Sequence, residues 1–134
     1  MVKKNNTVDA KSPVILIVED SPTQAASLNL LLAQHGVQVL WAENGKDCLK
    51  FVDKVLPDLI IMDLEMPEMN GFQTCERLKQ RSDTVDIPVI MLTHHDEAEF
   101  AKLGLQQGVV DYIPKDAFSN AVLLETLKQM NLVH

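Results

Sequence analysis

The sequence lacks the features of secreted, disulfide-bonded and membrane-spanning proteins. It has two cysteines, Cys48 and Cys75, without the Cys-x-x-Cys spacing of metal and redox motifs, so we expect free, partly buried thiols. The opening residues contain no apolar segment typical of a signal peptide. No run approaches the roughly 18 apolar residues that a membrane-spanning helix needs. These absences predict a cytoplasmic protein that does not insert into a membrane.

The sequence is also poor in positive charge. It has 12 lysines and arginines against 19 aspartates and glutamates, which gives a formal net charge of -7. The basic residues form no cluster within the predicted domain, whereas contact with nucleic-acid phosphates needs clustered lysine and arginine. Direct binding to nucleic acid is therefore not expected.

The length and the apolar content predict one domain. A chain of 134 residues that is 46% hydrophobic can bury a sizeable core but is too short for two ordinary domains. Residues 1–12 are polar and show no apolar period, which is typical of a flexible tail. The domain is therefore predicted to span residues 13–134.

Within this domain, short apolar segments rich in β-branched residues alternate with longer segments of helical period. Strands are predicted at residues 14–18, 37–42, 58–62, 87–92 and 109–113. Helices are predicted from Pro22, after Gly45 and from Gly71, and over residues 96–107 and 119–131. The apolar positions expected to face the core in three of these helices are Ala25, Leu28, Leu31, Leu32, Phe100, Leu103, Leu105, Val122, Leu123, Leu127 and Met130.

Five strand–helix units with nearly continuous apolar strands predict an α/β fold, in which a parallel sheet is covered by helices on both faces. We expect a doubly wound (βα)5 domain of the flavodoxin-like class. Its strand order, 2-1-3-4-5, is taken from fold precedent.

Polar side chains stand where the predicted strands end. Glu19 and Asp20 follow the first strand, Asp63 the third and Thr93 the fourth, and Lys115 lies two residues beyond the fifth. The carboxyl ends of parallel strands form the rim of the ligand crevice in such sheets. With the assumed strand order, the three carboxylates converge while Thr93 and Lys115 approach from the other side.

Crowded carboxylates need protonation or a cation. Mg²⁺ prefers oxygen ligands and keeps several waters, which suits a shallow site, and its charge together with that of Lys115 balances three carboxylates. Phosphorylation of Asp63 would add about one further negative charge. The Thr93 hydroxyl then offers a hydrogen bond, while Lys115 stabilises phosphoryl oxygens.

Together these segments resemble the receiver domain of two-component response regulators, including the chemotaxis regulators, over residues 13–133. The matching segments are Val-Glu-Asp-Ser at 18–21, Asp-Leu-Glu-Met-Pro-Glu-Met-Asn-Gly at 63–71, Leu92-Thr93, and Asp-Tyr-Ile-Pro-Lys at 111–115. Each segment is weak alone, but together, in the family's order and spacing, they are highly specific.

The resemblance implies a signalling phosphoacceptor rather than a conventional enzyme. Asp63 would accept a phosphoryl group from the phosphohistidine of a sensor histidine kinase or phosphotransfer protein. The implied Mg²⁺ ligands are Glu19, Asp20, Asp63 and the backbone carbonyl of Glu65. The protein would be a monomer or a phosphorylation-dependent dimer, and its downstream target stays open.

The resemblance also implies a switch. Thr93 would move toward the phosphoryl group and Tyr112 would turn inward, which alters the face of the fourth helix, fifth strand and fifth helix for a partner. Glu65, His94 and His95 border the site and are candidates for tuning the phosphoryl lifetime. Adjacent histidines in a loop rarely direct both rings at one ion, so a transition-metal site at His94 and His95 is not favoured.

Other functions remain as alternatives to this interpretation. The first is a receiver-like interaction module that works without phosphorylation, against which the intact acidic set, Thr93 and Lys115 all argue. A flavin-binding protein would need a phosphate-binding loop in place of Glu19-Asp20. A Mg²⁺-dependent phosphohydrolase of the haloacid-dehalogenase type would need a second aspartate, where this chain has Glu65.

One segment departs from the family pattern. Most receivers place proline after the lysine, whereas Pro114 precedes Lys115 here and Asp116 follows it. A cis bond without proline costs about 2.5–4 kcal/mol, so we expect a trans Lys115–Asp116 bond. Asp116 is expected to be solvated or to cap the following helix.

Overall fold

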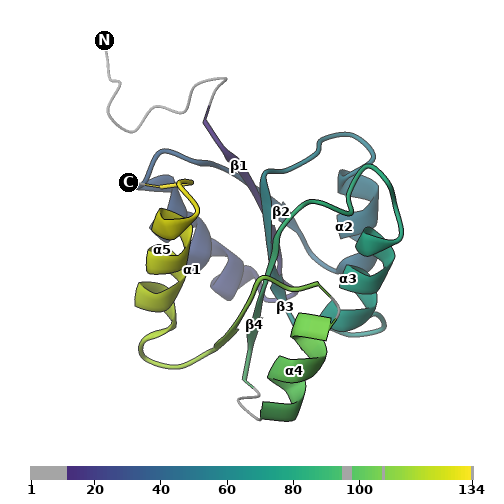
Figure 1. Cartoon of the computed structure of the whole chain (residues 1–134). Coiled ribbons are helices and arrows are strands. Elements are labelled where there is room, and N and C mark those ends of the chain that lie inside the picture. The colour runs from purple at the N-terminus through teal and green to yellow at the C-terminus, as the bar shows by residue number, and fades with distance from the viewer. Residues whose placement is uncertain (1–11, 95–97, 107, 134) are drawn as a thin grey trace.

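A computed structural model describes residues 12–94, 98–106 and 108–133, and these form one α/β unit (Figure 1). The predicted tail at residues 1–12 lies outside the described residues except for Ser12, as does His95. The strands are β1 (Val14–Val18), β2 (Gln38–Ala42), β3 (Leu59–Asp63), β4 (Val89–Thr93) and β5 (Asp111–Pro114). The helices are α1 (Pro22–Ala33), α2 (Gly45–Phe51), α3 (Gly71–Lys79), α4 (Ala98–Gln106) and α5 (Ser119–Gln129).

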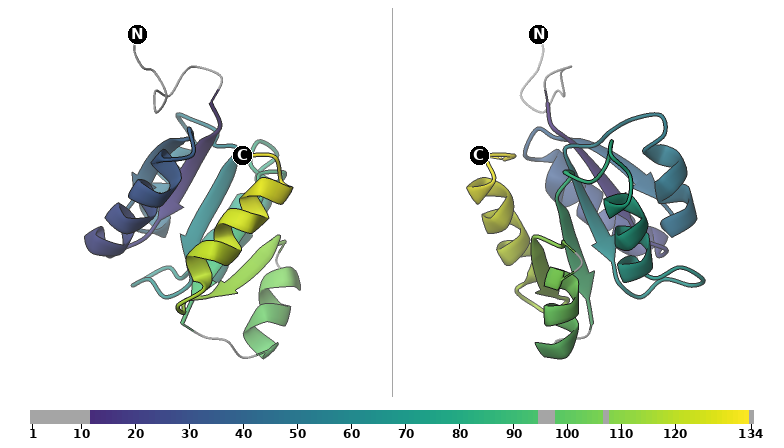
Figure 2. Two further views of the ribbon diagram at one scale, coloured as in Figure 1. Left: turned by 90° about the vertical axis from the view of Figure 1, so that its left-hand side faces the viewer. Right: turned by 45° about the vertical axis from the view of Figure 1, so that its right-hand side comes forward.

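The five strands pair in parallel in the order β2-β1-β3-β4-β5, which confirms the predicted fold class and strand order. Helices α1 and α5 cover one face of the sheet, and α2, α3 and α4 cover the other, as the turned views show (Figure 2). Every residue of β3 and β4 is buried, which explains why both strands are apolar up to their last residues, Asp63 and Thr93.

Alternation along the strands divides the core into two layers. Ile15 and Ile17 pack on the α1 and α5 side with Leu32 and Leu127. Leu16 and its alternate neighbours pack on the α2 and α3 side, in a cluster that includes both buried cysteines. No helix among the described residues is long and apolar enough to cross a membrane.

Helix α1 begins as the sequence predicts. Ser21 is the N-cap, and its hydroxyl accepts a hydrogen bond of 3.3 Å from the Gln24 N–H, while Pro22 occupies the first helical position. Gly36 follows the helix with a φ of 76°, a backbone conformation that favours glycine.

The fifth strand starts two residues later than predicted. The Val109 N–H donates to the Gly104 carbonyl at 3.0 Å, so Val109 closes the end of α4. Val110 makes the first bond to β4, through the Val89 carbonyl at 2.9 Å, and the strand itself begins at Asp111. Apolar character alone did not separate a helix cap from a strand here.

Three apolar side chains predicted to face the core are exposed instead. Leu103, Leu105 and Val122 are 39%, 61% and 44% exposed. Among residues 102–106 of α4, for which the structure describes burial, Gly104 is the buried position, and an added Cβ there would lie 3.3 Å from ring atoms of Phe72 and Tyr112. The helix therefore approaches the sheet through Gly104, which directs the flanking leucines outward. In α5, Leu123 and Leu127 occupy the buried face; the Phe100 side chain lies outside the description.

Gly71 fixes the start of α3 against the end of β3. Its N–H donates to the Leu64 carbonyl at 3.0 Å. An added Cβ would lie 2.8 Å from the Asp63 carbonyl oxygen and 3.0 Å from the Leu64 Cα. Only glycine permits this close approach. The start of α3 therefore packs directly against the backbone beside Asp63 and holds it in place.

We predict that Gly71→Ala lowers the free energy of unfolding by about 1–3 kcal/mol, because the new methyl group would lie 2.6 Å from Met91 Sδ and would also meet backbone atoms, which cannot move aside as a flexible side chain can. Urea denaturation measures the effect. Gly104→Ala is the comparison and should lower the free energy of unfolding less, since its Cβ would meet only side-chain atoms, at 3.3–3.8 Å. Equal stability of Gly71→Ala and the wild type would contradict this account of the loop.

Candidate functional site

Three carboxylates meet at the carboxyl ends of β1 and β3. Glu19 and Asp20 directly follow β1, Asp63 is the last residue of β3, and the two strands are neighbours in the sheet. One oxygen of each carboxylate lies within 4.8 Å of the others. Glu19 and Asp63 are 2% and 5% exposed, whereas Asp20 is exposed. The structure thus brings together the acidic residues that the sequence singled out.

The backbone of Glu19 is held by strand β2. Its N–H donates to the Ala42 carbonyl at 3.0 Å, and its carbonyl accepts a bond of 2.8 Å from the Trp41 indole N–H. The Glu19 side chain also accepts from the Ser21 N–H at 3.1 Å. Sequence periodicity gives no signal for an indole bond to a neighbouring strand.

Burial makes these carboxylates hard to ionise. It raises the pKa of Glu19 to about 7, and the nearby charge of Asp63 adds to the effect. Burial also raises the pKa of Asp63, against the opposing influence of Lys115. A cluster of oxygen donors with this excess of negative charge fits a hard divalent cation, which would favour the ionised forms.

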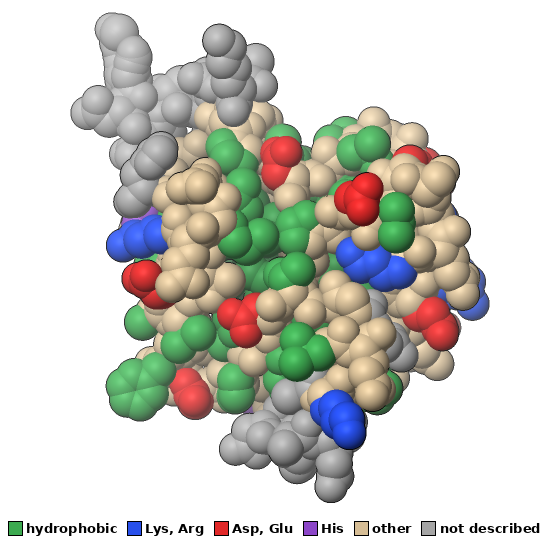
Figure 3. All heavy atoms as spheres, viewed as in Figure 1, with side chains coloured by type: hydrophobic (Ala, Val, Ile, Leu, Met, Phe, Trp, Pro, Cys, Tyr) green, Lys and Arg blue, Asp and Glu red, His purple; other side chains and the backbone are tan. Residues whose placement is uncertain are grey.

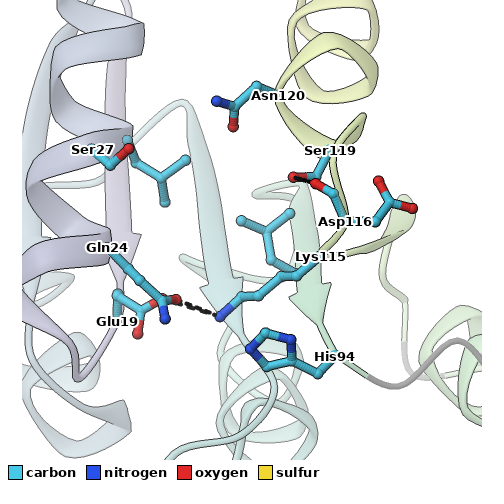
Figure 4. Close-up of a pocket in the computed structure, with 10 residues that line it drawn as sticks. Glu19, Gln24, Ser27, His94, Lys115, Asp116, Ser119 and Asn120 are labelled. Carbon is cyan, nitrogen blue, oxygen red and sulfur yellow. Dashed lines mark hydrogen bonds and ion pairs between the residues drawn. The ribbon is translucent and has the colours of Figure 1, made fainter.

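Lys115 supplies the positive charge beside the cluster. Its Nζ lies 3.2 Å from Asp63 Oδ1 and 3.4 Å from Glu19 Oε1. A third contact, of 2.8 Å, reaches Gln24 Oε1 on α1 (Figure 4). An ammonium group has three hydrogens to donate, and these oxygens match them in number. The Lys115 backbone N–H also donates to the Thr93 carbonyl at 2.6 Å, which ties the segment after β5 to the end of β4.

Sequence reasoning missed Gln24. It stands four residues after Asp20, so one helical turn returns its side chain toward the strand ends. This spacing is the sequence feature from which Gln24 could have been predicted to lie near the site. Beyond Gln24 and Lys115 a cavity of about 330 Å³ opens between α1 and the start of α5, lined by Ser27, Leu92, His94 and Asn120 among others (Figure 4).

Thr93 and Glu65 meet at the end of β4. The Thr93 side chain is fully buried, and its hydroxyl donates to the Glu65 carboxylate. The same carboxylate accepts the backbone N–H of the exposed residue His94 at 3.1 Å. The Glu65 N–H donates to Asp63 Oδ1 at 3.2 Å. The sequence pointed to Glu65 beside the site but did not show that its side chain contacts Thr93.

Tyr112 is half-buried on β5. Its ring stacks against Phe72 of α3, with centroids 6.4 Å apart and planes 15° from parallel. Met91 pairs with Tyr112 across the sheet and lies two residues before Thr93, so alternation places Thr93 on the same face as Met91. Tyr112 packs against the core of that face too, so the two predicted switch residues share one side of the sheet.

Asp116 is exposed and turns the chain toward α5. Its Oδ1 accepts from the Phe118 N–H at 2.7 Å, and its carbonyl accepts from the Ser119 hydroxyl at 3.0 Å. The described residues contain no cis peptide bond, which confirms the expected trans bond between Lys115 and Asp116.

Comparisons of the sequence with known proteins agree on one family. The sequence pattern of the response regulator receiver domain matches residues 15–128. Protein PilH of Pseudomonas aeruginosa is 42% identical over 113 residues, which cover 84% of this chain and 93% of PilH. Among other curated relatives, the chain spans 8% of the length of Histidine kinase P4 from Formosa agariphila and 50% of that of YdfI from Bacillus subtilis.

Solved structures agree with this assignment. The receiver domain of a signal transduction histidine kinase from Syntrophus aciditrophicus has a TM-score of 0.80 and 39% identity, and the match covers 89% of each chain. The receiver domain of sensor histidine kinase PA1611 from Pseudomonas aeruginosa holds a magnesium ion in its active-site cleft. It has a TM-score of 0.78 and 25% identity, over 88% of this chain and 96% of that one. The chain belongs to the response regulator receiver domain family.

Proposed function

We propose that this receiver domain accepts a phosphoryl group on Asp63 from the phosphohistidine of a sensor histidine kinase or a phosphotransfer protein. The observation that carries the proposal is the arrangement around Asp63. Its buried carboxylate stands among oxygen donors that suit a cation, with Lys115 Nζ 3.2 Å away. We place this phosphoryl transfer in the cytoplasm.

The metal ligands in this proposal are the carboxylates of Glu19, Asp20 and Asp63 and the backbone carbonyl of Glu65. The number and type of oxygen donors support Mg²⁺, as does the magnesium in the related PA1611 receiver. When bound, the metal neutralises charge on the carboxylates and on the phosphoryl oxygens.

In the transfer step, a carboxylate oxygen of Asp63 forms a bond to phosphorus while the phosphorus–nitrogen bond to the donor imidazole breaks. The imidazole leaves with the electron pair of that bond and takes up a proton. The Lys115 ammonium, held by Glu19 and Gln24, lies where it can stabilise charge on the phosphoryl oxygens. The protein thus contributes to the transfer step by positioning the reacting groups and by stabilising charge.

Signal output would use the face of α4, β5 and α5. Thr93 moves toward the phosphoryl group, Tyr112 turns inward, and a target protein reads the changed surface. Exposed apolar side chains on these elements or directly before them support such docking, and they are Leu103, Val110, Phe118 and Val122. Figure 3 shows hydrophobic side chains gathered along the middle of the view, between the side of α5 and the side of α3. The domain works as a monomer or as a phosphorylation-dependent dimer.

We predict that Asp63→Asn abolishes labelling when the protein is incubated with phosphorylated histidine kinases of its source organism, because the amide is a poor nucleophile. Autoradiography of the phosphotransfer reaction provides the measurement. Asp86→Asn, which alters an exposed carboxylate away from the cluster, should be labelled as strongly as the wild type. A wild-type protein that no kinase labels would favour the phosphorylation-independent interaction module.

Lys115→Ala should leave Mg²⁺ binding largely intact but uncouple Asp63 from the switch, because the metal ligands remain and the fixed positive charge is lost. Amide NMR shifts in Mg²⁺, before and after beryllofluoride, separate the two effects. We expect the response near Thr93 and Tyr112 to disappear in this variant and to persist in Lys128→Ala, an exposed lysine of α5. A wild-type response from Lys115→Ala would refute this role.

The raised pKa of Glu19 predicts a pH dependence. A carboxyl group whose pKa rises from 4.5 to about 7 on folding stabilises the metal-free protein below pH 4.5, and this stability is lost as the pH rises through about 7. Mg²⁺ must displace the same proton, so its apparent affinity should rise up to about pH 7 and then level off.

Fluorescence of Trp41, the single tryptophan, can report this titration because its indole is bonded to the Glu19 backbone. Glu19→Gln should weaken Mg²⁺ binding and flatten the dependence between pH 4.5 and about 7. Glu76→Gln, an exposed carboxylate on α3, is the control and should keep the wild-type profile. An affinity independent of pH in the wild type would contradict the assignment.

A further inference from the structure

The Glu65 side chain links the phosphoacceptor to the end of β4. One carboxylate oxygen accepts the Thr93 hydroxyl, and the other accepts the His94 N–H at 3.1 Å. The backbone N–H of the same residue donates to Asp63 Oδ1 at 3.2 Å. Glu65 is therefore bonded both to the residue that would be phosphorylated and to the hydroxyl that would respond.

The Thr93 hydroxyl cannot serve two acceptors at once. A hydroxyl has one hydrogen to donate, and in this structure it is donated to Glu65. The Thr93 side chain is fully buried, so a hydroxyl without an acceptor would be costly there. A phosphoryl oxygen on Asp63 must therefore compete with the Glu65 carboxylate for the same hydrogen.

From this competition we propose that the Glu65 carboxylate is a positioning residue that holds the Thr93 hydroxyl, and the start of the following loop, in the resting arrangement. The inference rests on the proposed function, because it presumes that Thr93 binds the phosphoryl group. The bond between the Glu65 carboxylate and the Thr93 hydroxyl opposes the switch. Its strength sets part of the free-energy difference between the resting and switched arrangements.

Two properties of Glu65 need to be separated. Hydrogen bonds to a charged acceptor are about twice as strong as those between neutral groups, so the Thr93 contact favours the resting arrangement. The Glu65 charge also lies near Asp63 and would repel an incoming anion whether or not Thr93 has a hydroxyl. Only the first effect depends on Thr93, and a double-mutant cycle isolates it.

The experiment measures the beryllofluoride concentration that gives a half-maximal amide NMR response near Asp63, at saturating Mg²⁺. Four proteins form the cycle: the wild type, Glu65→Ala, Thr93→Val and the double variant. Thr93→Val keeps the side-chain volume but removes the hydroxyl. Glu65→Gln is added because it removes the charge and keeps a carbonyl oxygen as acceptor, and it provides a second test if Glu65→Ala fails to fold.

In the protein with Thr93, we expect Glu65→Ala to lower the half-maximal concentration by about tenfold, the effect of losing a hydrogen bond to a charged group. Glu65→Gln should lower it less. In the Thr93→Val background, Glu65→Ala should change it by no more than about twofold. Hydrogen exchange of the His94 amide should also accelerate in Glu65→Ala without beryllofluoride, because the contact that protects it is lost.

Equal effects of Glu65→Ala in the two backgrounds would overturn the inference, since Glu65 would then act by charge alone. Equal effects of Glu65→Gln and Glu65→Ala in the protein with Thr93 would overturn it for the same reason. Failure of the proposed function looks different: the wild type itself would show no response near Asp63 at any beryllofluoride concentration.

Discussion

The repulsion among three crowded carboxylates is the constraint on which the rest of the site depends. Glu19 and Asp63 are almost fully buried, and the fold accepts this because Lys115 places an ammonium group 3.2–3.4 Å from both. The Lys115 backbone is bonded to the Thr93 carbonyl at the end of β4, and Gln24 bonds to the ammonium group from α1; both contacts hold the ammonium beside the carboxylates. Removing the charge of any one of these residues therefore changes the electrostatic environment of the others.

The same constraint explains how a local event at Asp63 can reach a distant surface. Asp63 Oδ1 is bonded to Lys115, which extends from the end of β5, and to the Glu65 N–H, whose side chain contacts Thr93 at the end of β4. A phosphoryl group would compete for both connections. The neighbouring strand β5 carries Tyr112, packed against α3 and α4, so both routes end at the face that we assign to output.

Much of the fold and the acidic cluster could be predicted from the sequence, because the buried strands are continuous apolar segments and parallel strands end at one edge. The remaining errors come from packing. Apolar spacing suggested that Leu103 and Leu105 face inward, but close approach through Gly104 decided the rotation of α4. Helical spacing from Asp20 indicates that Gln24 lies near the strand ends, but it does not predict the bond to Lys115. The Glu65 contact with Thr93 depends on which way a long side chain turns, and sequence periodicity carries no such information.

The central claim is that Asp63 is the phosphoacceptor, and mass spectrometry tests it most directly. The wild-type protein is incubated with Mg²⁺ and a small-molecule phosphodonor, reduced with borohydride to trap the acyl phosphate, and digested. We predict that the protein gains one phosphoryl group before reduction and that the trapped residue is Asp63. An unmodified protein, or trapping at another carboxylate, would contradict the account.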